Sequence, residues 1–332
     1  MGANYQKRVL NNFVGQAWAP GVIQNLQKNM TDYSIDSSHC HLWFDKSIPP
    51  ALSMDSGQTV SFKTLDACWG EVRCIEDFHR YRRNNPHGGS NPITGPVYIH
   101  QAVPGGTLIV DVNQIDLDST GFQLIGPHRA MIQDEITDWT LHQVHAHNGR
   151  VRLSNGLDLP ADPVIGQLGT APAVPRVSYA NPCGGNLDCP LVRTGAKVYF
   201  PIEVPGALFS VGDVHARQGD GEIVGAPEIG ATVALRLTCA KQRLANWPVV
   251  EDSDGWHVIS AAPTESEAIR LAVFELSRLI QAKENRSMAD AMILLTMTAR
   301  IRCARSGRWG DQGPVASVSI PKQFVPELLP WR

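Results

Sequence analysis

The sequence predicts a mainly β protein, built as sandwich-like or barrel-like sheets, with an α+β region at its C-terminal end. The chain has 332 residues, and its 29 Gly and 23 Pro are spread throughout. Such spacing cuts a chain into short pieces and favours strands joined by turns. Several of these pieces are rich in β-branched residues, which is typical of strands. Clear helical spacing behind a capping signal occurs only after residue 263.

The strand candidates begin with residues 58–67, QTVSFKTLDA, whose alternation places Val60, Phe62 and Asp66 on one face. Further candidates are 105–117, 197–204 and 231–239, and 90–99 carries Asn-Pro and Gly-Pro turn signals before another strand.

The helix candidates follow near the C-terminal end. Residues 264–284 open with a capping box formed by Thr264 and Glu267, and Ser287 opens 287–302 in the same manner. Two further segments are predicted as loops, namely the basic segment 79–87, HRYRRNNPH, and the Pro- and Gly-rich stretch from about 151 to 186. We therefore expect an N-terminal extension (1–36), a β-rich core that carries the site (37–260) and an α+β region packed on it (261–332).

Composition excludes several classes of function. The net charge is −3 with no block of Lys or Arg, so no nucleic-acid partner is expected. There is no run of about 18 apolar residues and no apolar signal core, which predicts a soluble, cytoplasmic chain without a membrane partner. The seven cysteines form no C-x-x-C pair, which favours reduced thiols.

The segment 212–222, GDVHARQGDGE, concentrates the candidate site residues. If the chain is extended there, Asp213 and His215 project from the same apolar face as Phe209. A buried carboxylate is costly unless a cation or several donors satisfy it, so the Asp-x-His pair predicts two ligands of a divalent metal. The imidazole makes Zn²⁺ the first choice. The alternative is a hydrogen-bonded Asp–His pair in the core.

More ligands and a general base are available in the sequence. His41, in SSHCHLWFD, and Asp66 are candidate ligands. Asp220 and Glu222 lie in a glycine-rich turn, where a carboxylate beside bound water could take its proton. The alternative for this turn is an ordinary surface hairpin.

The segment 205–222, PGALFSVGDVHARQGDGE, resembles the hallmark of the acetamidase/formamidase family. The resemblance continues in the same order through other blocks and covers roughly residues 37–322: HLWFDKSIPPALSMDSGQTVSFKTLDA, NPITGPVYI, PVIGQLGTAP, GGNLD, DAMILLT and VSIPK. It implies a mainly β, metal-dependent enzyme, usually a homo-oligomer, that hydrolyses small amides to a carboxylate and ammonia. The positions that match its motifs are His41, Asp66, Asn91, Gly185, Asn186, Asp188, Asp213, His215, Asp220 and Glu222.

The chain also departs from the family pattern. Glu228 stands one residue earlier than the family's usual glutamate, Trp43 is displaced by one residue, and Cys68-Trp69 replaces small residues. These departures leave hydrolysis as the expectation but question formamide or acetamide as the specific substrate.

The resulting hypothesis is a metal-dependent hydrolase of a small amide C–N bond. His41, Asp66, Asp213 and His215 would bind one or two divalent ions, Zn²⁺ first and a second such as Ca²⁺, with Glu222 or Asp220 as the general base. Asn186 and nearby backbone N–H groups would stabilise the oxyanion. The alternatives are a non-catalytic, metal-stabilised binding protein on the same scaffold, and a hydrolase of a larger or cyclic amide.

Overall fold

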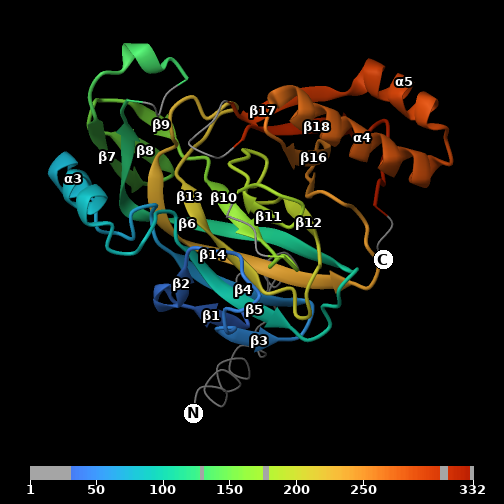
Figure 1. Cartoon of the computed structure of the whole chain (residues 1–332), viewed down its shortest axis with the longest axis horizontal. Helices are drawn as coiled ribbons and strands as arrows, with labels where there is room; N and C mark the ends of the chain where they lie inside the picture. Colours follow the sequence, from blue (N-terminus) through green and yellow to red (C-terminus); the bar gives the residue numbers. More distant parts are fainter. Residues whose placement is uncertain (1–30, 128–130, 175–178, 307–312, 330–332) are drawn as a thin grey trace, which may run out of the picture.

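The predicted fold class is confirmed by the computed structural model, which describes residues 31–127, 131–174, 179–306 and 313–329. Strands make up most of the regular structure and join into one large, branched sheet system (Figure 1). The strands are β1 (Tyr33–Ile35), β2 (Cys40–His41), β3 (Leu52–Met54), β4 (Gln58–Thr64), β5 (Ile93–Ile99), β6 (Thr107–Ile125), β7 (Thr140–His147), β8 (Arg150–Leu153), β9 (Asp158–Pro160), β10 (Val164–Gly169), β11 (Gly184–Asn186), β12 (Lys197–Pro201), β13 (Phe209–His215), β14 (Glu228–Ala240), β15 (Val249–Glu251), β16 (Gly255–Ala261), β17 (Arg300–Arg305) and β18 (Val315–Pro321).

The long strand β14 lies at the centre of the core, between β4 and β6. It pairs antiparallel with β4 along one edge and with β6 along the other. Strand β13, in which every residue is buried, pairs antiparallel with β10 and β5 and meets β14 only where His215 opposes Glu228. The start of β14 and the end of β13 therefore lie together, and this junction positions the candidate site.

Alternating residues of β6 and β12 join two hydrophobic cores. Leu108, Val110 and Phe200 belong to the main core between the sheets. Ile109 and Tyr199 point to the opposite face and pack into a second core formed with the C-terminal region. Because successive side chains of a strand alternate between faces, one strand can hold both layers together.

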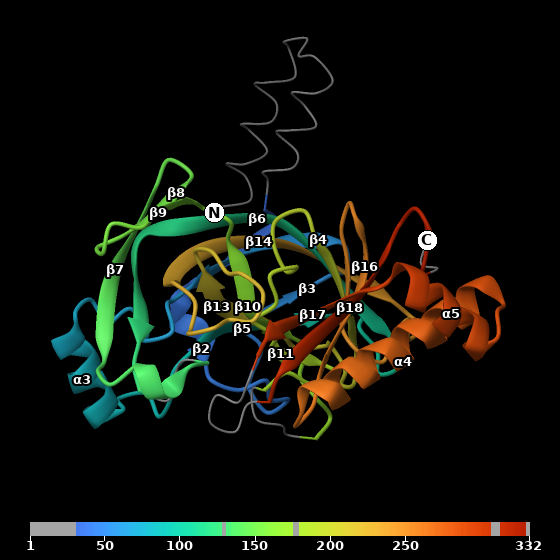
Figure 2. The ribbon, with the colours of Figure 1, turned by 90° about the horizontal axis from the view of Figure 1, so that it is seen from above.

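Among the described residues, the α-helices lie at the two ends in both views, with α3 (Ile75–Asn84) at one end and α4 (Glu265–Glu284) and α5 (Met288–Thr298) at the other (Figures 1 and 2). Short 3₁₀ turns occur at η1 (Ser37–His39) and η2 (Gln133–Glu135). Helix α4 contacts β16 and β18 and begins behind Thr264, whose hydroxyl accepts a hydrogen bond from the Glu267 backbone N–H at 3.3 Å. The predicted N-cap at Thr264 is confirmed, and its hydroxyl also donates to Glu267 Oε2 at 2.8 Å.

Two loop predictions are wrong. The basic segment 79–87 continues helix α3 as far as Asn84, because Phe78 and Tyr81, three residues apart, are buried on one side of the helix while its basic side chains are exposed. The stretch from 151 to 186 contains most of β8 and all of β9, β10 and β11. All six residues of β10 are buried, so its small and apolar residues form an interior strand.

Residues 1–30 of the predicted extension (1–36) lie outside the described residues. In the rest of the extension, β1 pairs parallel with β4. All seven cysteines are free thiols. In the part of the chain that the structure describes, every helix is too short or too polar to cross a membrane.

Candidate active site

Asp213 and His215 converge at the end of β13, as strand alternation predicts. Each is only 1% exposed, and His215 Nε2 lies 3.7 Å from Asp213 Oδ1. The surrounding residues of β13 are fully buried. The two side chains therefore form a polar centre inside an apolar strand, where an unpaired charge is expensive.

Glu228, at the start of β14, completes a group with this pair. It lies opposite His215 across the β13–β14 pairing, with Oε1 3.8 Å from His215 Nε2. Asp188 and Glu222 form a second group around the same imidazole, and within each group the candidate ligand atoms lie within 4.8 Å of one another. Two atoms bound to one Zn²⁺ at about 2.0–2.2 Å lie at most about 4.4 Å apart. Small side-chain shifts would bring either group to that spacing.

A chain of hydrogen bonds orients His215. The side-chain amide of Gln218 donates from Nε2 to the Asp188 carbonyl at 2.6 Å, which fixes Oε1 as the atom facing His215. His215 Nδ1 lies 2.7 Å from that oxygen and must donate to it, because an amide oxygen only accepts. Nε2 thereby faces the carboxylates and is the ring nitrogen that could bind a metal.

The carboxylates around His215 leave buried oxygens without partners. Among the described residues, Asp188 Oδ1, Asp213 Oδ2, Glu222 Oε2 and Glu228 Oε2 are buried and accept no hydrogen bond. A Cβ placed on Gly166 of β10 would lie 2.8 Å from both Asp188 Oδ1 and Asp213 Oδ2, so glycine leaves room beside these oxygens. Buried polar atoms are normally satisfied, and divalent cations bound at the two groups would satisfy these oxygens.

The protonation of the cluster also fits a cation. Burial raises the pKa of Asp188, and it raises the pKa of Glu222 and of Glu228 well above the usual carboxyl range, with neighbouring acids adding to the effect. Burial opposes the charged forms of Asp213 and His215 too. Their mutual attraction outweighs it, which lowers the pKa of Asp213 and, with Glu228, raises the pKa of His215 well above its ordinary value. So many buried acids cannot all ionise without compensating positive charge.

Side chains from distant parts of the sequence hold the two aspartates. Asn91 donates from Nδ2 to Asp213 Oδ1 at 2.7 Å, and Arg305, at the end of β17, donates from Nη1 to Asp188 Oδ2 at 2.6 Å. Asn91, Asp188, Asp213 and Glu222 all have positive φ, between 39° and 59°. Side chains other than glycine rarely adopt this conformation, and such strain concentrates at functional sites.

The two predicted general bases differ in position. Glu222 reaches the cluster, and its Oε2 is buried there. The side chain of Asp220 is 48% exposed and lies 3.7 Å from the guanidinium of Arg302. The turn therefore directs one acid inward and the other outward.

Two predicted metal ligands are not brought into either group. Asp66 is 2% exposed, but its carboxylate accepts hydrogen bonds from Arg73 Nη1 at 2.9 Å and from the backbone N–H groups of Cys68 and Gly70. His41 lies between the Trp43 carbonyl at 2.9 Å and the Ser210 hydroxyl at 3.1 Å, and burial lowers its pKa to about 4. Asp66 thus stabilises the turn that contains Cys68 and Gly70.

The predicted oxyanion residue, Asn186, is buried in β11 beside the cluster-forming segment. It pairs with Gln167 of β10, and its carbonyl accepts a hydrogen bond from Arg305 at 3.3 Å. Asp188, which belongs to the second group, follows two residues later.

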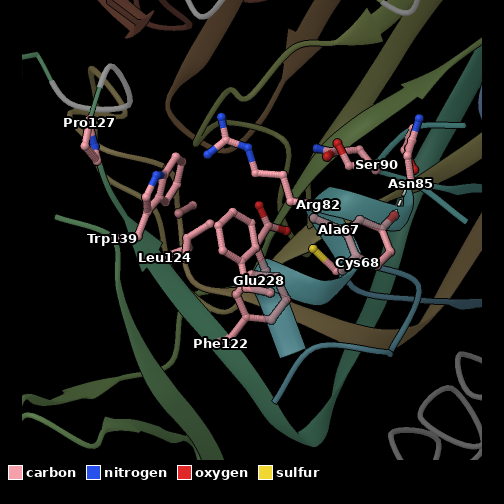
Figure 3. A pocket seen from close by; sticks show the side chains of 16 residues that line it. Ala67, Cys68, Arg82, Asn85, Ser90, Phe122, Leu124, Pro127, Trp139 and Glu228 are labelled. Atoms are coloured by element: carbon pink, nitrogen blue, oxygen red, sulfur yellow. Dashed lines mark hydrogen bonds between the residues drawn. The ribbon is translucent and has the colours of Figure 1, made fainter. Parts of the chain in front are cut away.

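A pocket of about 420 Å³ opens beside the cluster (Figure 3). Glu228 and Asn91 belong to its wall, and both also contact the Asp213 environment, Asn91 through its hydrogen bond and Glu228 as a member of the same group. A small molecule in this pocket would therefore reach the carboxylates.

The comparison with protein families bears directly on this cluster. The family model described as the acetamidase/formamidase family matches residues 175–255, a range that includes every member of both groups. The chain carries an acetamidase/formamidase domain. The family resemblance predicted from the sequence is thereby confirmed.

Related proteins extend the similarity over the whole fold. The crystal structure of an acetamidase from Bacillus halodurans is 28% identical, with a TM-score of 0.81, and the match covers 89% of this chain and 99% of that one. A predicted acetamidase/formamidase from Thermoanaerobacter tengcongensis is 26% identical, also with a TM-score of 0.81, covering 89% and 97%. A protein of Schizosaccharomyces pombe that carries the name formamidase provisionally is 24% identical over 293 residues, 69% of this chain and 70% of that protein. Together these matches support an amide hydrolase.

The site contains residues that the sequence does not single out as ligands. Glu228 is noticeable in the sequence only as a displaced glutamate, and its contact with His215 depends on the pairing of β13 with β14. No sequence signal points to Arg305 or Gln218, because their contacts with Asp188 and His215 are seen only in the structure.

Proposed function

We propose that this protein is a metal-dependent hydrolase of open-chain amides, releasing ammonia and a carboxylate. The observation that carries the proposal is the convergence of four unpartnered, buried carboxylate oxygens on His215, beside a pocket that a small molecule can enter. The match of residues 175–255 to the acetamidase/formamidase family model supports an amide C–N bond as the bond that is cleaved. A homo-oligomeric, cytoplasmic protein is the accompanying prediction.

Asp213, His215 and Glu228 would hold the first ion, in place of the set that includes His41 and Asp66. One imidazole nitrogen with carboxylate oxygens suits Zn²⁺. Nε2 of His215 can bind only one ion, so a second ion would rely on the carboxylates of Asp188 and Glu222. An all-oxygen position of that kind suits a hard cation such as Ca²⁺.

These residues would hold a divalent ion, which when bound would supply Lewis-acid chemistry for an amide carbonyl and lower the pKa of water. Glu222, whose buried Oε2 has no partner, takes the proton of the attacking water as its oxygen bonds to the amide carbon. The same carboxyl returns that proton to the nitrogen as the C–N bond breaks, and ammonia leaves with a carboxylate as the second product. Donors near Asn186 face the developing oxyanion in this scheme.

The choice between the two candidate bases can be tested by a matched pair of variants. Glu222→Gln should lower kcat for amide hydrolysis by about 10²–10⁴-fold, the usual contribution of a general base. Asp220→Asn removes an exposed acid paired with Arg302 and should leave kcat within about threefold of wild type, since surface ion pairs contribute little. The reverse order of effects would make Asp220 the base.

The activity itself is tested by elemental analysis of the purified protein and an ammonia-release screen over formamide, acetamide and larger amides. Bound divalent metal with ammonia release is the expected result. Bound metal with no ammonia from any amide would favour a non-catalytic, metal-stabilised binding protein. His215→Ala should lose the metal, and full occupancy in that variant would mean that Asp213 and His215 are only a core pair.

A further inference from the structure

The pocket beside Glu228 is far larger than formamide or acetamide requires. Those molecules have three or four heavy atoms, whereas cavities of about 300–1,000 Å³ enclose ligands of drug size. The volume of about 420 Å³ lies within that range. The small side chains of Ala67, Ala226 and Gly225 on its wall leave this space open.

Part of the pocket wall is aromatic. Phe78 and Tyr81 from α3, Phe122 from β6 and Trp139 line it, and the first three belong to a buried apolar cluster against which Trp139 packs. Figure 3 shows Trp139, Leu124 and Phe122 on one side of the pocket and Cys68 with Ala67 on the other.

Contacts among the lining residues hold this wall in place. The Phe78 and Trp139 ring centroids lie 4.9 Å apart, and the guanidinium of Arg82 lies over the Trp139 ring at 5.0 Å. The Tyr81 hydroxyl donates to the Gly89 carbonyl at 2.9 Å, so its polar end is already satisfied. The rings therefore present apolar surface to the cavity, and their side chains need not change conformation when a ligand binds.

Glu228 and Asn91 join the pocket to the cluster of carboxylates, and Arg82, Asn85 and Ser90 are the other polar residues of its wall. We propose that the site takes primary amides whose acyl group carries an uncharged aromatic ring. The carboxamide would lie at Glu228 and Asn91, and the ring would lie against Phe122 and Trp139. This inference rests on the proposed hydrolase function and names its substrate class.

The test compares phenylacetamide, hexanamide and acetamide in two measurements. Ammonia release gives kcat/KM for each amide as a substrate. Calorimetric titration of the chelator-treated protein gives the affinity for each amide as a ligand. Burying a phenyl group should favour phenylacetamide over acetamide by about tenfold to hundredfold in kcat/KM and in affinity. The aromatic wall should favour it over hexanamide by about threefold to tenfold.

Variants locate the effect in the pocket. Trp139→Leu should lower the ratio of kcat/KM for phenylacetamide to that for acetamide, and Trp139→Phe should retain most of it. Phe274→Leu replaces an aromatic side chain that is 55% exposed on α4, and it should leave both rates and their ratio unchanged.

The outcomes separate this inference from the proposed function. Hydrolysis of acetamide with no advantage for phenylacetamide, or an equal rate with hexanamide, would overturn the aromatic assignment and leave the hydrolase standing. Preferential binding of phenylacetamide without ammonia release from any amide would support the pocket assignment and overturn the hydrolase. Absence of both would overturn both.

Discussion

At the scale of single residues, the site depends on how His215 and its neighbouring acids share space. Gln218 fixes the ring through Nδ1, so that Nε2 faces Asp213 and Glu228. The oxygens that face the same region have no side chain between them, because β10 passes the site at Gly166. The geometry thus combines a fixed ligand nitrogen with room for an ion.

Gly166→Ala tests that room. The new Cβ would lie 2.7 Å from the Asp213 carbonyl oxygen and 2.8 Å from both Asp188 Oδ1 and Asp213 Oδ2, so the variant should bind far less metal, measured by elemental analysis after dialysis. Gly169→Ala is the control, because its Cβ would meet only backbone of the Cys183–Gly185 segment, the nearest atom at 2.4 Å, and strain the same strand away from the acids. Full metal content in Gly166→Ala, or equal loss in both variants, would argue against a cation beside Gly166.

The pKa shifts predict how metal binding depends on pH. The raised pKa values of His215, Glu222 and Glu228 mean that the cation-free cluster retains protons to a higher pH than isolated side chains of the same kind would. Ligand atoms must be deprotonated to bind a metal, so binding should release protons, and affinity should rise with pH. Titration of Zn²⁺ in two buffers of different ionisation enthalpy at pH 7 measures this release. Binding with no net proton release would contradict the assignment of these groups as ligands.

At the scale of elements, the sequence predicts local structure well where the signal is local. Helix α4 runs from Glu265 to Glu284 behind the predicted cap, and Asp213 and His215 share a face as alternation requires. Helix α3 was predicted as a loop because its charges conceal the apolar spacing of Phe78 and Tyr81, which is short and is buried only by neighbouring elements.

The cap of α4 can be tested directly. Thr264→Ala removes the hydroxyl that accepts from the Glu267 N–H, and it should lower the free energy of unfolding by about 1 kcal/mol, a typical loss for an N-cap. Urea denaturation measures the change. Ser266→Ala, at an exposed position of the same first turn, is the matched control and should change stability by less than about 0.5 kcal/mol. Equal effects of the two substitutions would remove the special role of Thr264.

At the scale of the whole molecule, the site is assembled from segments that only the complete fold brings together. Asp188 follows β11, His215 ends β13, Glu228 begins β14 and Arg305 ends β17 of the C-terminal region. The register that places His215 opposite Glu228 is set by the turn between them and by the strands on either side, not by the residues' own spacing.

The same limit applies to Asp66, whose contacts the sequence does not show. Asp66 was predicted to bind metal because it ends an apolar face and matches a family motif. In the structure, Arg73 and two backbone N–H groups occupy its carboxylate. A sequence reveals which residues can ligate, whereas competing partners seven or fewer residues away decide whether they are free to do so.

The central claim, that this cluster is a metal-dependent amide hydrolysis centre, is tested most directly by following ammonia release through removal and return of the metal. Wild-type protein treated with a chelator should lose both metal and ammonia release, and adding Zn²⁺ should restore both. Asp213→Asn should regain neither, because it removes the ionised carboxylate shared with His215 and Asn91. Undiminished ammonia release by protein shown to be free of metal would contradict the account.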